Sequence, residues 1–199
     1  VESPDMSTTE FSPSPKSEPE DRTTFGPFDE SEVSGVRPWI DLGSIKLIPR
    51  EGLNLRVEVE DGSNRVVAVA LDYMGSTLQI QPFSAPRNEG LWHEIRAQIT
   101  QQVTGQGGTL QEQVGPLGIE LVASVPTAGK GKQVVRFLGV DGPRWFLRGV
   151  IVGPAATDGD GRAALVDLYR SLVVVRGNTP MPPRELLPLA LPAQAGGLL

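Results

Sequence analysis

The stretch VVRFLGVDGPRWFLRGVIVG, residues 134–153, constrains the fold more than any other part of this 199-residue chain. Two apolar runs flank the tetrapeptide Asp141-Gly142-Pro143-Arg144. An aspartate that bonds its own backbone, a glycine with free φ and a proline with fixed φ together predict a tight turn. The valine, phenylalanine, leucine, tryptophan and isoleucine residues on either side favour strands. We therefore predict a long, largely buried hairpin at the centre of a sheet.

The pattern of apolar and polar residues predicts further strands before this hairpin. Residues 53–59 alternate with a period of two, which is typical of a half-buried strand. A turn at 61–64, Asp-Gly-Ser-Asn, leads into a more apolar strand at 65–73, which we place nearer the sheet centre. A third strand is expected at 77–83. These segments predict an antiparallel meander.

Two stretches have the apolar spacing of amphipathic helices. In residues 91–103 apolar side chains recur every three or four positions, with Asn88 as the expected N-cap and Gly105 as the stop. Residues 162–175 follow the same pattern, and Asp160 is their expected N-cap, because a helix N-terminus favours a carboxylate. We therefore predict one helix before the central hairpin and one after it.

These elements define a fold class. With two more strands expected at 109–114 and 117–125, the order of elements is βββ–α–ββ–ββ–α. Consecutive strands that are joined by short turns form antiparallel sheets. We predict an α+β fold, an antiparallel sheet of about five to seven strands with two helices packed on one face.

Composition divides the chain into three parts. Residues 1–36 are rich in Ser, Thr, Pro and acidic residues, and we predict that they are disordered, because burial there cannot offset the backbone entropy. Residues 37–177 are expected to form the α+β domain. Residues 178–199 are a Pro/Leu-rich C-terminal tail, which is either docked on the surface or free. Phe25 and Phe28 belong either to a solvated turn or to a short motif that docks on a partner or on its own domain.

The negative charge of the chain is concentrated at its start. Residues 1–36 contain nine acidic and two basic side chains, a net charge of −7. The chain as a whole carries −6, so the remainder carries +1. A nearly neutral domain gives no electrostatic argument for binding nucleic acid or an anionic membrane.

Several classes of protein are excluded by composition. The chain has no cysteine, which excludes disulfides, thiolate metal sites and a cysteine nucleophile. No apolar run approaches the ~20 residues that cross a bilayer, and the acidic start lacks the features of a secretory signal. We expect a soluble, cytoplasmic protein without membrane insertion. Because the chain begins with Val1 rather than Met, we expect its natural N-terminus to lie upstream.

Residues that carry chemistry in other proteins are sparse here. The single histidine, His93, has no second histidine to share a metal. The Asp-Gly-Asp-Gly sequence at 158–161 resembles the start of a calcium loop, but it lacks the bidentate glutamate such a loop needs. The glycine-rich stretches lack the spacing of phosphate-binding loops. We therefore predict no catalytic residue, no cofactor and no metal.

The DGPRW turn is the strongest candidate for a structural or interaction motif. We expect Asp141 to pair with Arg144, or the Arg144 guanidinium to lie on Trp145. One interpretation is a turn lock that holds the register of the hairpin. The other is an exposed recognition tip, because Trp and Arg are common interface anchors. Arg148, four residues beyond Arg144, is expected on the same strand face.

Two motifs carry a resemblance to a known family. DLGS, at Asp41, Leu42, Gly43 and Ser44, and DGPRW, at 141–145, resemble the signature motifs of an uncharacterised actinobacterial family, domain-of-unknown-function family 3710. The resemblance spans about residues 36–188 and implies a cytoplasmic bacterial protein with no assigned activity. The order of elements is also similar, more weakly, to the type III secretion chaperone-like fold. That similarity implies a protein-binding module that is often dimeric.

Three functions compete at this point. The leading hypothesis is a non-catalytic protein-binding module, chaperone- or adaptor-like, with a protein partner or self-association. The second is a nucleic-acid-binding domain whose phosphate contacts would come from basic residues on the sheet face. These residues are Arg56, Arg65, Lys130, Lys132, Arg144 and Arg148. The third is a small hydrolase whose site combines Asp41, Asp141 and Arg144.

Overall fold

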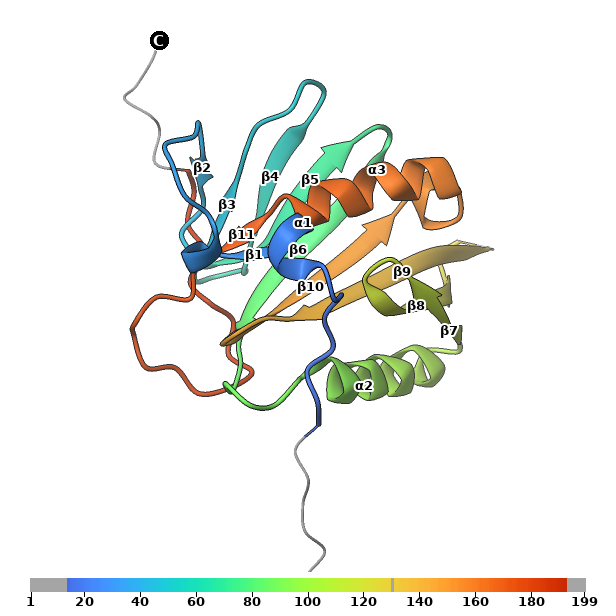
Figure 1. Ribbon diagram of the computed structural model, residues 1–199. Helices are drawn as coiled ribbons and strands as arrows, with labels where there is room; N and C mark the ends of the chain where they lie inside the picture. The colour runs from blue at the N-terminus through green and yellow to red at the C-terminus, as the bar shows by residue number, and fades with distance from the viewer. Residues whose placement is uncertain (1–13, 130, 193–199) are drawn as a thin grey trace, which may run out of the picture.

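A seven-stranded antiparallel sheet is the frame of the molecule (Figure 1). The computed structural model describes residues 14–129 and 131–192. In spatial order the strands are β4 (Asn54–Val59), β5 (Val66–Tyr73), β6 (Ser76–Ser84), β10 (Trp145–Val152), β9 (Lys132–Asp141), β8 (Gly118–Pro126) and β7 (Thr109–Gly115). The predicted α+β class with an antiparallel sheet is confirmed.

The predicted central hairpin is also confirmed. Strand β10 is the middle strand of the sheet and pairs with β6 on one side and β9 on the other. In the hairpin Phe146 lies opposite Asp141, and Val150 lies opposite Phe137. Because the residues of β10 are buried on both sides of the sheet, this strand needs cover on both faces.

The two long helices lie on opposite faces of the sheet, so the prediction that both pack on one face was wrong. Helix α3 (Gly159–Arg170) packs on the face that presents Leu147 and Ile151. Helix α2 (Trp92–Gly105) packs on the face of Phe146 and Val150, the alternate positions along β10. The periodicity of a helix shows which of its sides is apolar, but not which sheet face it covers.

Close packing fixes α2 against the hairpin. A Cβ atom at Gly139 of β9 would lie 2.4 Å from the indole ring of Trp92. The indole stacks on Phe146 with ring centroids 5.7 Å apart, and its Nε1 donates to the carbonyl of Ile119 at 2.8 Å. The glycine in β9 therefore creates the space that the first turn of α2 fills.

A small second sheet covers one end of the α3 face. Its order is β1 (Phe28–Asp29), β11 (Val173–Val174), β3 (Ile45–Leu47) and β2 (Ile40–Asp41), and β1 pairs with β11 in parallel. The predicted helix over 162–175 ends at Arg170, because the β-branched Val173 and Val174 pair as β11. Short helices α1 (Arg22–Phe25), η1 (Glu30–Glu32) and η2 (Pro154–Ala156) complete the elements.

The predicted helix N-caps were both wrong. Helix α3 is capped by Asp158, whose carboxylate accepts from the backbone N–H of Gly161 at 3.1 Å, rather than by Asp160. Helix α2 begins after Leu91, which has no capping side chain of its own, and Asn88 is not its cap. The carboxylate that accepts from the N–H groups at the start of α2 belongs to Asp141, at the end of β9.

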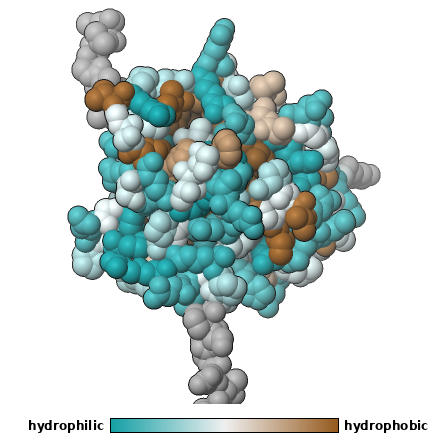
Figure 2. All heavy atoms as spheres, in the orientation of Figure 1, coloured by the Kyte–Doolittle hydropathy of each residue, from teal (hydrophilic) through white to brown (hydrophobic). Residues whose placement is uncertain are grey.

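Both terminal segments of the described chain lie against the domain. Residues 14–36, where composition predicts disorder, form α1, β1 and η1, and residues 1–13 lie outside the described residues. In the C-terminal segment Leu186 forms an isolated antiparallel β-bridge with Phe83, and the side chain of Leu187 is fully buried. Within 178–192, the docked alternative is the one observed. The face drawn in Figure 2 is mostly hydrophilic, with apolar residues in small separate groups.

A buried ion pair lies where β8 and β9 pass under η2. The guanidinium of Arg136 donates to Glu120 at 2.8 Å, and both side chains are almost fully buried. The Nε of Arg136 donates to the carbonyl of Ala156 at 3.2 Å. The pair joins the neighbouring strands β8 and β9 to η2, which precedes α3.

Replacing Arg136 by Met should reduce the free energy of unfolding by about 3–5 kcal/mol, because it leaves the Glu120 carboxylate buried without its counter-charge. Urea unfolding measures the change. Arg50→Met, which breaks the pair between Arg50 and the exposed Asp167, is the matched control and should have little effect. Equal losses in the two variants would contradict this reading of the buried pair.

Candidate binding site

The carboxylate of Asp141 joins three distant parts of the chain. Asp141 is 1% exposed, at the end of β9. Its oxygens accept from the backbone N–H of Leu91 at 2.8 Å, Ser17 at 2.9 Å and Trp92 at 3.5 Å. Leu91 and Trp92 begin α2, so this carboxylate caps the helix from another element and faces its positive end. Burial raises the pKa of Asp141, and the N–H donors act in the opposite direction.

Trp145 is fully buried, which fits the turn-lock interpretation and leaves no exposed indole for a recognition tip. The Nε1 of its indole donates to Asp29 at 2.9 Å. The cation above its ring is Arg22, at 5.7 Å, rather than the expected Arg144. Gly142 allows this arrangement, because a Cβ atom there would lie 2.3 Å from the indole.

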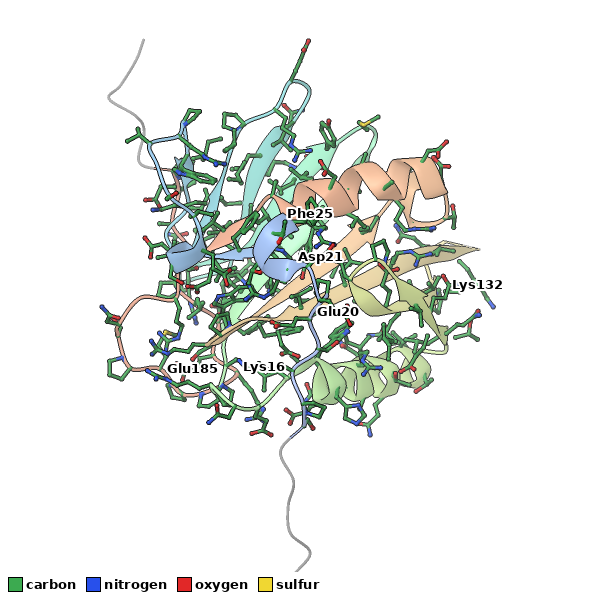
Figure 3. The ribbon with its side chains drawn as sticks, viewed as in Figure 1. Lys16, Glu20, Asp21, Phe25, Lys132 and Glu185 are labelled. Carbon is green, nitrogen blue, oxygen red and sulfur yellow. The ribbon has the colours of Figure 1, made fainter. Side chains whose placement is uncertain are left out.

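The N-terminal segment completes the surroundings of the turn. The ammonium of Lys16 donates to the carbonyls of Gly142 and Pro143. Figure 3 shows Lys16, Asp21 and Phe25 along this segment as it crosses the sheet. Arg144 is half-buried and borders a surface hollow, and its own carbonyl accepts from Ala85 at 3.0 Å. The DGPRW motif is therefore the place where the N-terminal segment is held.

Arg22 anchors that segment, and sequence reasoning missed it. Arg22 is 4% exposed and makes two hydrogen bonds to the Glu32 carboxylate, at 2.7 and 2.8 Å. It also donates to Glu18 at 2.9 Å. The FGPFDESEV stretch was the available signal, since Phe28 and Asp29 of that stretch form β1 on the chain's own domain.

The DLGS motif holds the C-terminal segment. The carboxylate of Asp41 accepts from the N–H of Gly43 at 2.8 Å, which fixes a turn where Gly43 has φ of +88°. The N–H of Ser44 donates to the carbonyl of Pro188 at 3.1 Å, and the N–H of Ala190 donates to the carbonyl of Leu42 at 2.9 Å. Asp41 and Asp141 have no hydrogen-bond partner in common among the described residues, so no shared acidic site is formed.

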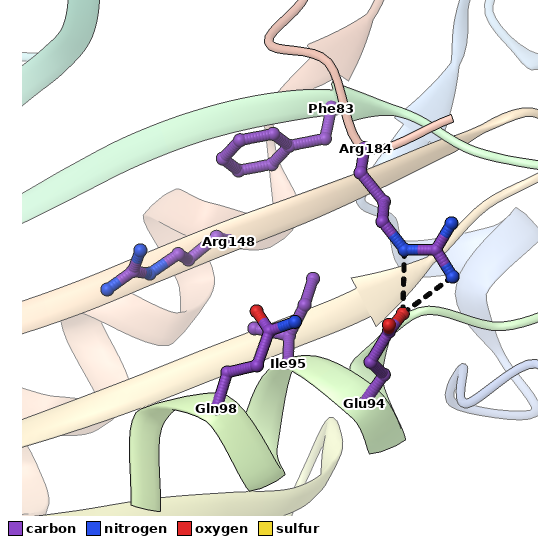
Figure 4. A pocket seen from close by; sticks show the side chains of 6 residues that line it. All are labelled: Phe83, Glu94, Ile95, Gln98, Arg148 and Arg184. Atoms are coloured by element: carbon purple, nitrogen blue, oxygen red, sulfur yellow. Dashed lines mark hydrogen bonds and ion pairs between the residues drawn. The ribbon is translucent and has the colours of Figure 1, made fainter. Parts of the chain in front are cut away.

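Arg148 takes no part in the hydrogen bonds of either motif and lies in a separate pocket. The pocket, of about 190 Å³, lies between α2, β6, β10 and the C-terminal segment (Figure 4). It is lined by Phe83, Glu94, Ile95, Gln98, Arg148 and Arg184. Figure 4 shows Ile95 and Gln98 rising from α2, with Phe83 on the opposite side.

Of the two arginines in this pocket, Arg184 has a counter-charge and Arg148 has none among the described residues. Arg184 is paired with Glu94 at 2.8 Å. The Nε of Arg148 is buried and has no hydrogen-bond partner among the described residues, and its guanidinium lies 5.6 Å from the ring centre of Phe137. Burial without a counter-charge lowers the pKa of Arg148. The pocket therefore combines an apolar wall with an uncompensated cation.

The described basic residues of the nucleic-acid hypothesis lie on different parts of the molecule. Arg56 makes two hydrogen bonds to Asp72, at 2.5 and 2.9 Å, on the open half of the sheet. Lys132 begins β9, at the end opposite the DGPRW turn (Figure 3). Lys130 lies outside the described residues. Arg148 is in the pocket described above.

Replacing Asp141 by Ala should reduce the free energy of unfolding by at least about 2 kcal/mol, because buried N–H groups lose their acceptor. Asp141→Asn keeps one oxygen acceptor and should lose less. The same loss frees the backbone of Ser17, so trypsin should cleave after Lys16 faster in Asp141→Ala. Urea unfolding and the rate of cleavage at Lys16 measure the two effects; an unchanged rate would show that Asp141 does not hold the segment.

Asp72 should contribute an acid-sensitive part of the stability. Hydrogen bonds from Arg56, and then from Thr77, lower its pKa to about 2. The unfolded chain has an ordinary aspartate pKa of about 3.9, so the contribution is complete above about pH 5 and is lost as the pH falls toward 2.

Asp72→Asn should therefore show a smaller fall in the urea midpoint between about pH 6 and pH 2 than the unmodified protein. Asp61→Asn, in the exposed turn between β4 and β5, is the control and should retain the full fall. Identical pH dependence in Asp72→Asn and the unmodified protein would contradict the assignment.

Comparison with known proteins places the chain in a family. A family model described as "Protein of unknown function (DUF3710)" matches residues 26–197. No curated protein and no solved structure matches the chain. The matched region includes both motifs, the described C-terminal segment and residues 26–36 of the N-terminal segment. No helix within the described residues is long and apolar enough to cross a membrane. The chain belongs to the DUF3710 family of proteins of unknown function.

Proposed function

We propose that this protein is a non-catalytic binding module that takes an acidic segment of a partner protein into the pocket at Arg148. The observation that carries the proposal is the guanidinium of Arg148, whose Nε is buried without a hydrogen-bond partner among the described residues. Arg148 as a whole is half-buried, and a cation that has lost part of its water without gaining a counter-charge is unfavourable in the free protein. Its presence supports a complex in which a carboxylate completes the pair.

The energetics of the pocket favour an anionic group. The folded protein has already removed part of the water from Arg148, so an entering carboxylate does not have to displace all of it. A bond between a guanidinium and a carboxylate is charge-assisted and stronger than a neutral hydrogen bond. The surrounding low dielectric strengthens it further.

The size of the pocket favours a side chain over a free small molecule. Its volume of about 190 Å³ is below the roughly 300–1,000 Å³ of typical small-molecule sites. Phe83 and Ile95 offer an apolar wall beside the cation, and the amide of Gln98 can donate a further hydrogen bond. This combination supports recognition of an aspartate or glutamate with an apolar neighbour.

The competing functions have less support. Among the basic residues proposed to contact phosphates, Arg56 is already neutralised by Asp72. For the hydrolase, Asp41 is exposed and occupied by its own turn, and Asp141 is occupied by backbone N–H donors. The similarity to type III secretion chaperones and the cytoplasmic location stay predictions.

A random peptide library displayed on phage and selected on the immobilised protein tests the proposal. We expect enrichment of peptides with Asp or Glu beside an apolar residue. Arg148→Gln should weaken binding of a selected peptide by at least about tenfold, the equivalent of one charge-assisted hydrogen bond. Arg65→Gln, at an exposed arginine before β5, is the matched control and should bind normally.

Stability measurements separate binding from folding. Arg148→Gln removes an unpaired, half-buried cation, so the free energy of unfolding should stay equal or increase while peptide binding is lost. Selected peptides without acidic residues, or unchanged binding by Arg148→Gln, would contradict the proposal. A salt-dependent shift of labelled DNA or RNA by the protein would instead favour the nucleic-acid hypothesis.

A further inference from the structure

The two edges of the large sheet differ in how they are protected. Strand β4 has a shift in register between Glu58 and Val59 and carries the charged side chains of Arg56 and Glu58. Bulges and charges of this kind discourage pairing with another strand. Strand β7, at the other edge, pairs with β8 without a shift from Thr109 to Gly115. Within the described residues no strand pairs with its outer side, so its outward N–H and C=O groups are a template for one more strand.

The sequence of β7 is complementary to itself. From 110 to 114 it reads Leu-Gln-Glu-Gln-Val, which is apolar, Gln, Glu, Gln, apolar in either direction. In an antiparallel pair with Glu112 at the two-fold axis, Leu110 lies opposite Val114 of the second copy. Gln111 then lies opposite Gln113 of the second copy, whose oxygen accepts from Arg136 at 3.4 Å and whose amide nitrogen is able to donate to Gln111. A two-fold interface requires this kind of self-complementarity.

The side chains of β7 fit such a pair. Val114 is 88% exposed, an unusual position for an apolar residue, while Leu110 packs on the core beneath α2. Pairing would place each Val114 against Leu110 of the other copy. Two facing carboxylates at Glu112 would repel, but Arg96 of α2 already holds Glu112 at 2.8 Å, which neutralises each of them.

We propose that β7 pairs with β7 of a second copy of this chain, antiparallel and centred on Glu112, so that the two large sheets become one continuous sheet. This dimer is independent of the pocket at Arg148, because the edge strand β7 contributes no residue to that pocket. In this dimer the two β4 strands, which are protected by their bulge and charges, form the outer edges of the continuous sheet.

A single-cysteine experiment tests the register directly, because the chain has no cysteine of its own. In Glu112→Cys the two cysteines face each other with Cα atoms about 4.5–5.5 Å apart, within the roughly 4.4–6.8 Å range of disulfides. Mild oxidation with diamide should give a covalent dimer. Gln111→Cys, whose cysteines would be offset by two residues along the strands, and Val59→Cys, on the β4 edge, should give no covalent dimer.

The oligomeric state of the cysteine-free protein gives a second readout. Analytical ultracentrifugation should show a dimer that dissociates on dilution. Val114→Asp places a carboxylate against Leu110 of the other copy and should raise the dissociation constant by at least about tenfold. Val59→Asp is the matched control, because Val59 is also exposed on an edge strand, and it should leave the dimer intact.

Three results would overturn the proposal. The unmodified protein could be monomeric at every concentration, or Val59→Asp could disrupt the dimer as much as Val114→Asp. Cross-linking of Gln111→Cys as efficient as that of Glu112→Cys would exclude the register. Circular dichroism of each variant shows whether its fold is intact.

Discussion

The hydrogen bonds to the Asp141 carboxylate hold together parts of the chain that no local interaction connects. One side chain receives the N–H of Ser17 from the N-terminal segment and the N–H of Leu91 from the start of α2. It does so from the end of β9, which is fixed by pairing with β8 and β10. The central hairpin therefore sets the position of a helix on one face and of the N-terminal segment that reaches the small sheet. Without an acceptor at this point, buried N–H groups would lose their partners.

The two family motifs have parallel roles. DGPRW receives the N-terminal segment through Asp141 and Trp145, and DLGS receives the C-terminal segment through Leu42 and Ser44. Neither motif forms a cluster of free acids and bases within the described residues. Both motifs contain Asp and Gly, which favour turns. The two aspartates accept hydrogen bonds from backbone N–H groups. The family match covers the C-terminal segment that DLGS holds, but it begins at residue 26, after the Lys16, Ser17 and Arg22 contacts of DGPRW.

The sequence predicts what is local and misses what is distant. The hairpin at 134–153 is predictable, because turn residues and flanking β-formers lie next to each other. The hydrogen-bond partners of Asp141 are 50 and 124 residues away in the sequence. The predicted pairing of Asp141 with the nearby Arg144 was therefore wrong. Disorder over 14–36 followed from polar composition. The structure differs from this prediction because Arg22 and Glu32 form an ion pair that is covered by the domain. The pairing offsets the loss of water by both side chains.

The candidate site was predicted only in part. Arg148 and Phe146 share a strand face, as the period of two requires. The pocket itself depends on α2 and on Arg184, which only the three-dimensional arrangement brings to that face. The buried pair of Arg136 with Glu120 was likewise invisible, since no periodicity marks two charged residues as neighbours in a core.

The small sheet has a consequence for biosynthesis. Strand β1 pairs with β11, and Asp21 bonds to Arg170, 149 residues further along the chain. During synthesis β1 leaves the ribosome long before its partner β11. The large sheet can assemble from neighbouring hairpins while translation continues, but β1 stays unpaired until β11 emerges. The small sheet can thus form only after synthesis has passed residue 174.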